Sequence, residues 1–131
     1  MSAEPAPRWG RPFPKPLSPR AHRRFDTLAA PGALLLAALL ARRDPPAAAC
    51  AALVAAGEGT AMLLTDYPPP VAGRALSFRQ HVAVANVHAG FIAGLALFVP
   101  GLARRSRPLL LAMAAVPLLL NALSDVEAGT G

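Results

Sequence analysis

Charged residues are scarce in this sequence, and their scarcity limits the class of protein that it can form. Of the 131 residues, 15% are charged and 54% are apolar, and the mean hydropathy is +0.42. A soluble domain of this size exposes much of its surface and commonly has about a quarter charged residues to cover it. The composition therefore disfavours a soluble globular domain and favours a protein of the membrane.

Cysteine and the motifs of common catalytic sites are also lacking. Cys50 is the single cysteine, which excludes an intramolecular disulfide and a metal cluster built on thiolates. The sequence shows no Ser-His-Asp arrangement, no phosphate-binding glycine loop and no pair of catalytic carboxylates. A chain of this length leaves no room for a separate catalytic module. We therefore predict a protein that is not an enzyme and that uses no cofactor and no metal.

The basic residues give a net charge of +6, but their placement argues against a nucleic-acid partner. The arginines stand at the ends of apolar runs, where charges set the topology of membrane proteins. Residues 1–24 hold six prolines and six basic residues without apolar periodicity, which predicts a disordered basic tail. Trp9 and Phe13 lie among these charges, so the tail either adheres to anionic lipid headgroups or only fixes the orientation of the chain.

Four apolar runs follow the tail, and each is long enough to cross a bilayer. The predicted spans are residues 25–41, 46–65, 80–101 and 108–124, and residues 127–131 form a short flexible C-terminus. A helix of about 17–22 residues measures roughly 25–33 Å, close to the thickness of the hydrocarbon layer. The sequence thus predicts an all-α fold, in which residues 25–126 form a four-transmembrane-helix bundle.

The basic residues also predict an orientation. With the N-terminus inside, the six basic residues of the tail join Arg74 and Arg79 on the cytoplasmic side, and the opposite side holds five arginines. The side richer in arginine and lysine faces the cytoplasm. We therefore expect a multi-pass protein of the cell (inner) membrane with both termini in the cytoplasm. Heavy use of alanine, arginine, proline and glycine is typical of a GC-rich bacterial genome.

The chain looks duplicated. Thr65-Asp66 at the end of the second span matches Ser124-Asp125 at the end of the fourth, 59 residues later. A looser match, with one gap, joins two polar pairs at the starts of the first and third spans: His22 with Asp26, and His81 with Asn86. We therefore predict two helical hairpins that are parallel repeats about an axis along the membrane normal.

A family resemblance points to the same architecture. Leu64-Thr65-Asp66-Tyr67-Pro68, followed after a short linker by Ser77-Phe78-Arg79-Gln80-His81, resembles small bacterial membrane proteins of the SPW-repeat type. The resemblance covers about residues 22–126, although Phe98-Val99-Pro100-Gly101 stands where the family has its Ser-Pro-Trp motif. It implies an internally repeated helical membrane protein and no enzymatic role.

Polar residues inside the spans are candidates for function, because burying them in a membrane is costly. The first and third spans begin on the side where the second and fourth end, so these polar residues should share one half of the bilayer. We expect a pocket open to one membrane face rather than a pore. The candidate polar site comprises Asp26, Glu58, Thr60, Asn86, His88 and Asn121.

Glu58 and His88 form the sharpest hypothesis among these residues. Both should lie about 12–14 Å into the membrane on neighbouring helices, where the two side chains could meet and hold a proton or a cationic group. Alternatively, Glu58, which is flanked by Gly57 and Gly59, is neutral and hydrogen-bonds across a helix contact. His81 and His88 are seven residues apart, which suits no metal pair without an added carboxylate.

The glycines of the third span predict a close helix contact. Gly90 and Gly94 form a GxxxG pattern, which allows helices to pack inside the bundle or against a second copy. Two functions follow from the whole pattern. The first is a non-enzymatic membrane protein with a structural or partner-assisting role, acting in the lipid bilayer as a homo-oligomer or with another membrane protein. The second is a small transporter or ligand-binding protein that uses the Glu58/His88 site.

Overall fold

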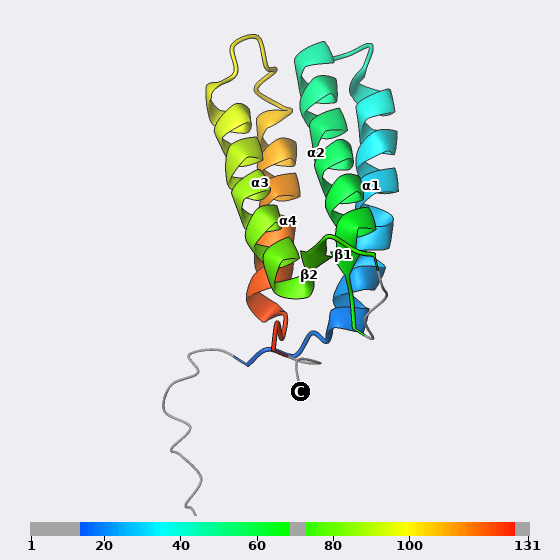
Figure 1. Cartoon of the computed structure of the whole chain (residues 1–131). Coiled ribbons are helices and arrows are strands. Elements are labelled where there is room, and N and C mark those ends of the chain that lie inside the picture. Colours follow the sequence, from blue (N-terminus) through cyan, green and yellow to red (C-terminus); the bar gives the residue numbers. More distant parts are fainter. Residues whose placement is uncertain (1–13, 69–72, 128–131) are drawn as a thin grey trace, which may run out of the picture.

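The computed structural model describes residues 14–68 and 73–127, and most of them lie in four helices (Figure 1). The helices are α1 (Pro19–Leu40), α2 (Pro45–Leu64), α3 (Phe78–Phe98) and α4 (Arg107–Leu123). Two short strands, β1 (Thr65–Asp66) and β2 (Leu76–Ser77), pair in parallel. The all-α prediction is confirmed, whereas the predictions for Trp9 and Phe13 in the tail and for the last four residues lie outside the described residues.

The first helix begins earlier than the sequence reading expected, because its capping signals lie in the predicted tail. The Ser18 hydroxyl accepts a hydrogen bond from the Ala21 N–H at 3.2 Å, and Pro19 occupies the first helical turn, where proline is tolerated. The prediction of disorder for residues 1–24 is therefore wrong for residues 19–24. α3 begins in a similar way, with a capping box between Ser77 and Gln80.

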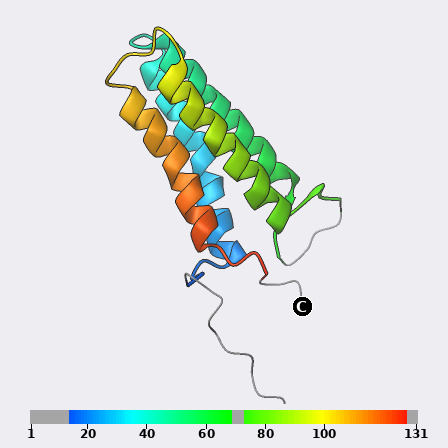
Figure 2. The same ribbon diagram turned by 90° about the vertical axis from the view of Figure 1, so that its left-hand side faces the viewer.

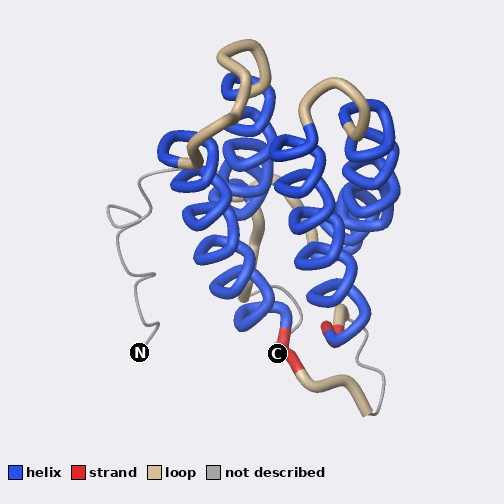
Figure 3. The backbone as a smooth tube through the Cα atoms, turned by 90° about the horizontal axis from the view of Figure 1, so that it is seen from above, coloured by secondary structure: helices blue, strands red, loops and turns tan. Residues whose placement is uncertain are grey.

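The helices form two hairpins that run side by side along the bundle (Figure 1), and the α3–α4 hairpin lies in front of the α1–α2 hairpin in the view turned by 90° (Figure 2). α1 packs against α2 and α3 against α4, and the hairpins meet mainly between α2 and α3. Seen from above, each hairpin is a pair of adjacent helices joined by a loop (Figure 3). α1 and α4 have little contact with each other.

Small residues fill the interior of the bundle, and large apolar side chains face outwards. Alanine supplies most of the buried apolar positions: Ala33, Ala47, Ala51, Ala55, Ala61, Ala85, Ala89, Ala96 and Ala114. The outer surface carries Leu28, Leu35, Val87, Phe98 and Leu119, which are 71, 63, 76, 82 and 63% exposed. Helices associate through small residues in membranes, whereas so large an apolar exterior is rare on a soluble monomer.

Two of the helices meet the length and composition of a membrane span by themselves. α2 has 20 residues and α3 has 21, and both reach a mean hydropathy of 1.6. α4 is apolar but has 17 residues, and the first turns of α1 carry arginines. The structure thus supports two candidate spans directly.

The hairpins are joined at the end of the bundle where the described chain begins and ends. Leu17 pairs with Ser124 in a parallel bridge, much as β2 pairs with β1 at Leu76 and Thr65. Each pairing links the start of one helix to the end of another, α1 to α4 and α3 to α2. The polar helix ends are therefore held together, as the sequence predicted, on one side of the bundle.

At the opposite end, Asp44 ties the two hairpin loops together. One carboxylate oxygen accepts from the Ala47 N–H at 3.2 Å and caps α2, and the other accepts from the Ala103 N–H at 3.0 Å in the loop between α3 and α4. A hydrogen bond with Ser106, followed by these two, lowers the pKa of the Asp44 carboxyl below its usual 3.8.

The GxxxG pattern of α3 does not serve packing inside the bundle. A Cβ added to Gly90 or Gly94 would meet nothing within 4 Å. The interior is contacted instead by Ala85, Ala89 and Ile92, which lie on a neighbouring stripe of the same helix. Of the two alternatives for these glycines, packing inside the bundle is therefore wrong, and packing against a second copy stays a prediction.

Candidate functional site: a buried His-Asp-His centre

Three ionisable side chains converge inside the polar end of the bundle. His22 and Asp26 from α1 and His81 from α3 are only 2, 4 and 0% exposed. The Nε2 atom of His22 lies 3.4 Å from one carboxylate oxygen of Asp26, and the Nε2 atom of His81 lies 3.2 Å from the other. We call this group the His-Asp-His centre.

The helix ends determine this arrangement. His22 and Asp26 are four residues apart on α1, which places both on one face of the helix. His81 lies in the first turns of α3, directly after its capping box. Because the pairings at Leu17 and Leu76 fix where α1 and α3 begin, they also fix where the two imidazole rings meet.

The outer nitrogen of each ring contacts a hydroxyl group. Nδ1 of His22 lies 2.6 Å from the Ser124 hydroxyl, and Nδ1 of His81 lies 2.9 Å from the Thr65 hydroxyl. Both hydroxyl groups donate their single proton to the backbone carbonyl one helical turn earlier, at 2.7 and 2.6 Å. Each hydroxyl must therefore accept from the ring, so both Nδ1 atoms are protonated and both Nε2 atoms face Asp26.

With both Nδ1 atoms protonated, the Nε2 atoms and the Asp26 carboxylate face each other without a positive charge between them. In a neutral ring protonated at Nδ1, the Nε2 atom carries a lone pair, which cannot hydrogen-bond to a carboxylate oxygen. A positive charge between the two groups is needed, either a second proton on the ring or a bound cation. Nε2 of His81 is fully buried and has no hydrogen-bond partner in the described part of the chain.

Aromatic side chains close the centre from outside. The Tyr67 hydroxyl donates to the Asp26 carboxylate, and burial followed by this hydrogen bond raises the pKa of Tyr67 above its usual 10.0. Phe78 packs edge-to-face on His22 with 5.1 Å between ring centroids. The guanidinium of Arg23 lies 5.8 Å from the centroid of the Tyr67 ring. Tyr67 therefore orients the carboxylate and also covers it.

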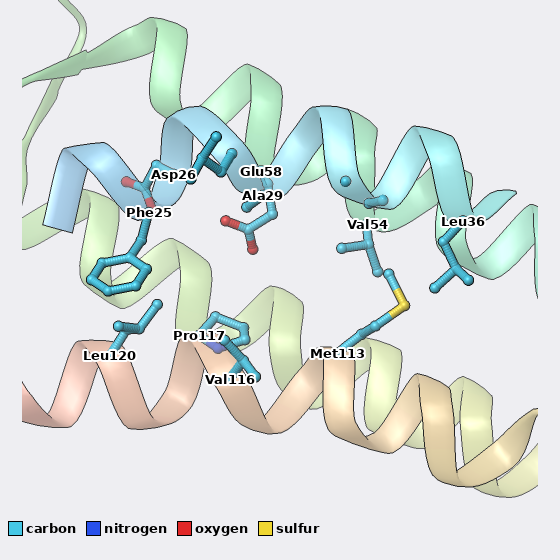
Figure 4. Close-up of a pocket in the computed structure, with 13 residues that line it drawn as sticks. Phe25, Asp26, Ala29, Leu36, Val54, Glu58, Met113, Val116, Pro117 and Leu120 are labelled. Atoms are coloured by element: carbon cyan, nitrogen blue, oxygen red, sulfur yellow. The ribbon is translucent and has the colours of Figure 1, made fainter.

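A cavity of about 260 Å³ lies beside the centre, between α1, α2 and α4 (Figure 4). The carboxylates of Asp26 and Glu58 are its ionisable groups, and the Glu58 side chain points into it. Its other lining side chains are apolar, and Phe25, Leu28 and Val116 among them are 48, 71 and 54% exposed. The mouth thus lies on the side of the bundle, which corrects the expectation of a pocket open to one membrane face.

Glu58 and His88 do not form the predicted pair. Glu58 is 5% exposed and faces the cavity, whereas His88 packs against Gly57 and lines a separate surface hollow with Val84 and Phe91. Nε2 of His88 has no hydrogen-bond partner in the described residues. Adjacent residues point about 100° apart on a helix, so the ring that contacts Gly57 is turned away from Glu58.

The remaining predicted residues lie outside the centre and the cavity. Asn121 donates to the side-chain oxygen of Asn86 at 2.8 Å, which links α4 to α3. Thr60 is exposed on the outside of α2, two residues beyond Glu58, so its inclusion in the site was wrong. Of the six predicted site residues, the structure brings together Asp26 and Glu58.

The sequence reading missed His22, His81 and Tyr67 as partners of Asp26, although one signal could have found the histidines. Leu-Ser-x-Arg-x-His occurs at residues 17–22 and again at residues 76–81, without a gap and 59 residues apart. Thr65 and Ser124 are separated by the same distance. The alignment with a gap already matched His22 to His81, but it also matched Asp26 to Asn86 and so did not show that the whole motif repeats without a gap.

Comparisons with known proteins identify no relative. No family model matches the chain, and the searches of curated proteins and of solved structures also give no match. The resemblance to SPW-repeat proteins therefore stays a prediction.

Proposed function

We propose that the chain is a four-span integral membrane protein, without enzymatic activity, that binds a small organic cation in the cavity between α1 and α4. The observation that carries the proposal is the lining of this cavity. Two buried carboxylates, Asp26 and Glu58, face a space whose other walls are apolar. A ligand that matches both features has a protonated amine and an apolar body.

The outer surface supports membrane insertion of all four helices. α1 and α4 expose leucines as α2 and α3 do, for example Leu34 at 58% and Leu119 at 63%. The 17 residues of α4 would measure about 26 Å, near the thickness of the hydrocarbon layer. Exposed arginines lie in both hairpin loops, at the ends of the proposed spans. We place the protein in the bacterial inner membrane with its termini in the cytoplasm.

The two hairpins are best explained as copies of one unit. Both contain the Leu-Ser-x-Arg-x-His motif at the start of a helix and a hydroxyl residue directly after the end of a helix. The equivalent residues of the two copies make equivalent contacts. The leucine of each motif pairs with the hydroxyl residue that follows a helix of the other hairpin, and the histidine of the same motif contacts that hydroxyl group. The pairings run between hairpins, so each copy completes the polar end of the other.

Glu58 is the residue that most directly needs a ligand. Within residues 14–68 and 73–127 it has neither a hydrogen-bond nor an ion-pair partner, whereas Asp26 contacts Tyr67 and two histidines. A buried carboxylate without a partner is unfavourable unless it takes up a proton or a cation. An ammonium group would supply the cation and up to three hydrogen-bond donors.

The proposal can be tested with a matched pair of small molecules. We expect 2-phenylethylamine, which is protonated at pH 7, to bind the detergent-purified full chain in calorimetric titrations. The neutral analogue 2-phenylethanol should bind at least about tenfold more weakly, a difference of about 1.4 kcal/mol. Glu58→Gln should abolish the preference for the amine, whereas Glu127→Gln, at the exposed C-terminal end, should keep it.

Two results would overturn this proposal. The first is equal binding of the amine and the alcohol by the original chain, which would show that the carboxylates play no part. The second is a preference for the amine that survives in Glu58→Gln. Gel filtration of each variant verifies that it is folded. If neither compound binds, ligand binding is rejected and the structural or partner-assisting role takes its place.

A further inference from the structure

We infer that the His-Asp-His centre is a binding site for a divalent transition-metal ion such as zinc. The inference goes beyond the proposed amine site: the two sites share Asp26, but the metal site adds His22 and His81, which are not among the residues that line the cavity. The sequence alone predicted no metal, since it did not bring these two histidines together.

The donor atoms suit a transition metal. Two imidazole nitrogens and a carboxylate oxygen are typical ligands of zinc and related divalent ions. The three side chains can each offer one ligand atom such that all lie within 4.8 Å of one another. Nε2 of His22 and Nε2 of His81 lie 3.4 and 3.2 Å from the two different carboxylate oxygens of Asp26. Each separation is close to the roughly 3.3–3.4 Å between neighbouring ligand atoms of a tetrahedral ion with bonds of about 2.0–2.1 Å.

The surrounding hydrogen bonds hold the donors in the form that a metal requires. A ligating histidine commonly donates its other ring N–H to a fixed acceptor, which sets the tautomer. Here the hydroxyls of Ser124 and Thr65 are those acceptors, and each is anchored to a backbone carbonyl. The Tyr67 hydroxyl holds the carboxylate of Asp26 in the same manner. All three ligands are therefore oriented from outside the centre.

The alternative to a metal is a second proton on the rings, and the geometry at His81 argues against it. Nε2 of His81 lies 3.2 Å from the Asp26 carboxylate but does not form a hydrogen bond with it. A proton at this atom would form an ion pair with the carboxylate but would lack a well-directed hydrogen bond to it, which weakens the interaction. A cation placed between the three ligand atoms would satisfy the lone pairs of both rings and the carboxylate together.

Cobalt is a suitable probe because tetrahedral Co²⁺ absorbs visible light and substitutes for zinc. We expect the full-length protein in detergent, first treated with a chelator, to bind one Co²⁺ per chain with a tetrahedral spectrum that Zn²⁺ abolishes. His22→Gln and His81→Gln should each weaken Co²⁺ binding by at least about tenfold. His88→Gln is the matched control, because His88 lies outside the centre, and it should bind as the original chain does.

The inference is wrong if the original chain binds no Co²⁺ or Zn²⁺, or if His88→Gln weakens binding as much as His81→Gln does. Should either glutamine variant fail to fold, Asp26→Asn and the thermal stability of the original chain provide further tests. Zn²⁺ should raise the unfolding temperature of the original chain and not that of Asp26→Asn. Loss of Co²⁺ binding in His81→Gln and loss of amine preference in Glu58→Gln are independent readouts.

Discussion

At the scale of single residues, Gly57 and Glu58 show how neighbouring positions on one helix serve different purposes. Gly57 admits the ring of His88 from α3, and Glu58 faces the cavity beside α1 and α4. The sequence singled out Glu58 and His88 for their polarity in an apolar stretch, and both are indeed in the bundle. The sequence could not predict whether these two side chains meet, because this depends on how far α2 is rotated about its own axis.

Replacing Gly57 with alanine should destabilise the protein. The added Cβ would lie 2.4 Å from the His88 ring, so the ring or the helix must move, at a typical overpacking cost of about 1–3 kcal/mol. Gly90→Ala is the matched control: its Cβ meets nothing within 4 Å, so helix propensity should leave it neutral or more stable by up to about 1 kcal/mol. Thermal unfolding in detergent measures both. Adding His88→Ala to Gly57→Ala should restore the lost stability, because the smaller side chain leaves room for the added Cβ. Equal unfolding temperatures of Gly57→Ala and Gly90→Ala would contradict the contact between Gly57 and His88.

Tyr67 should remain protonated at a pH where a free tyrosine ionises. Burial and the hydrogen bond to Asp26 raise its pKa above 10.0, so its contribution to stability is present below that pH and is lost as the pH rises further. Because Tyr67 is the single tyrosine, ultraviolet absorbance of the phenolate reports this residue alone. In chelator-treated protein we expect no phenolate signal near pH 10 until the chain unfolds. Ionisation of the folded chain at pH 10 would show that Tyr67 does not contact the carboxylate.

At the scale of helices, the apolar runs predicted the number of elements and approximately where three of them begin. α2, α3 and α4 begin within two residues of the predicted spans. α1 begins at Pro19 because a cap at Ser18 outweighs the prolines and arginines that suggested disorder. The GxxxG of α3 was misassigned because alanine, nearly as small as glycine, already provides the inner face at Ala85 and Ala89.

Asp44→Asn should weaken the link between the hairpin loops in a pH-dependent way. The lowered pKa of Asp44 means that its stabilising contribution is complete above pH 3.8 and disappears as the pH falls through the lower folded-state value. Asparagine can still cap α2, but it has one acceptor oxygen and loses the second bond, to Ala103 or Ala47. Unfolding temperatures of the two chains should therefore differ at neutral pH and converge under more acidic conditions. A difference independent of pH would exclude the carboxylate as its cause.

At the scale of the whole molecule, the chain has small residues inside, large apolar residues outside and the buried His-Asp-His centre at one end. The sequence pattern predicted a membrane protein and, from the positions of the polar residues along the apolar runs, that these residues share one end of the bundle. It could not predict the His-Asp-His centre, because this requires the ends of four helices to be brought together by pairings between residues far apart in sequence. Leu17 with Ser124 and Thr65 with Leu76 are those pairings.

In the proposed four-span bundle every helix crosses the bilayer, and cysteine labelling in intact cells tests this directly. In a Cys50→Ala background, single cysteines would replace Arg43 and Arg104 in the two hairpin loops, and Arg74 and Glu127 at the other end of the bundle; all four positions are exposed. We predict that a membrane-impermeant thiol reagent labels the two loop positions in intact cells and the other two only after lysis. Labelling of all four positions from one side would contradict the four-span bundle.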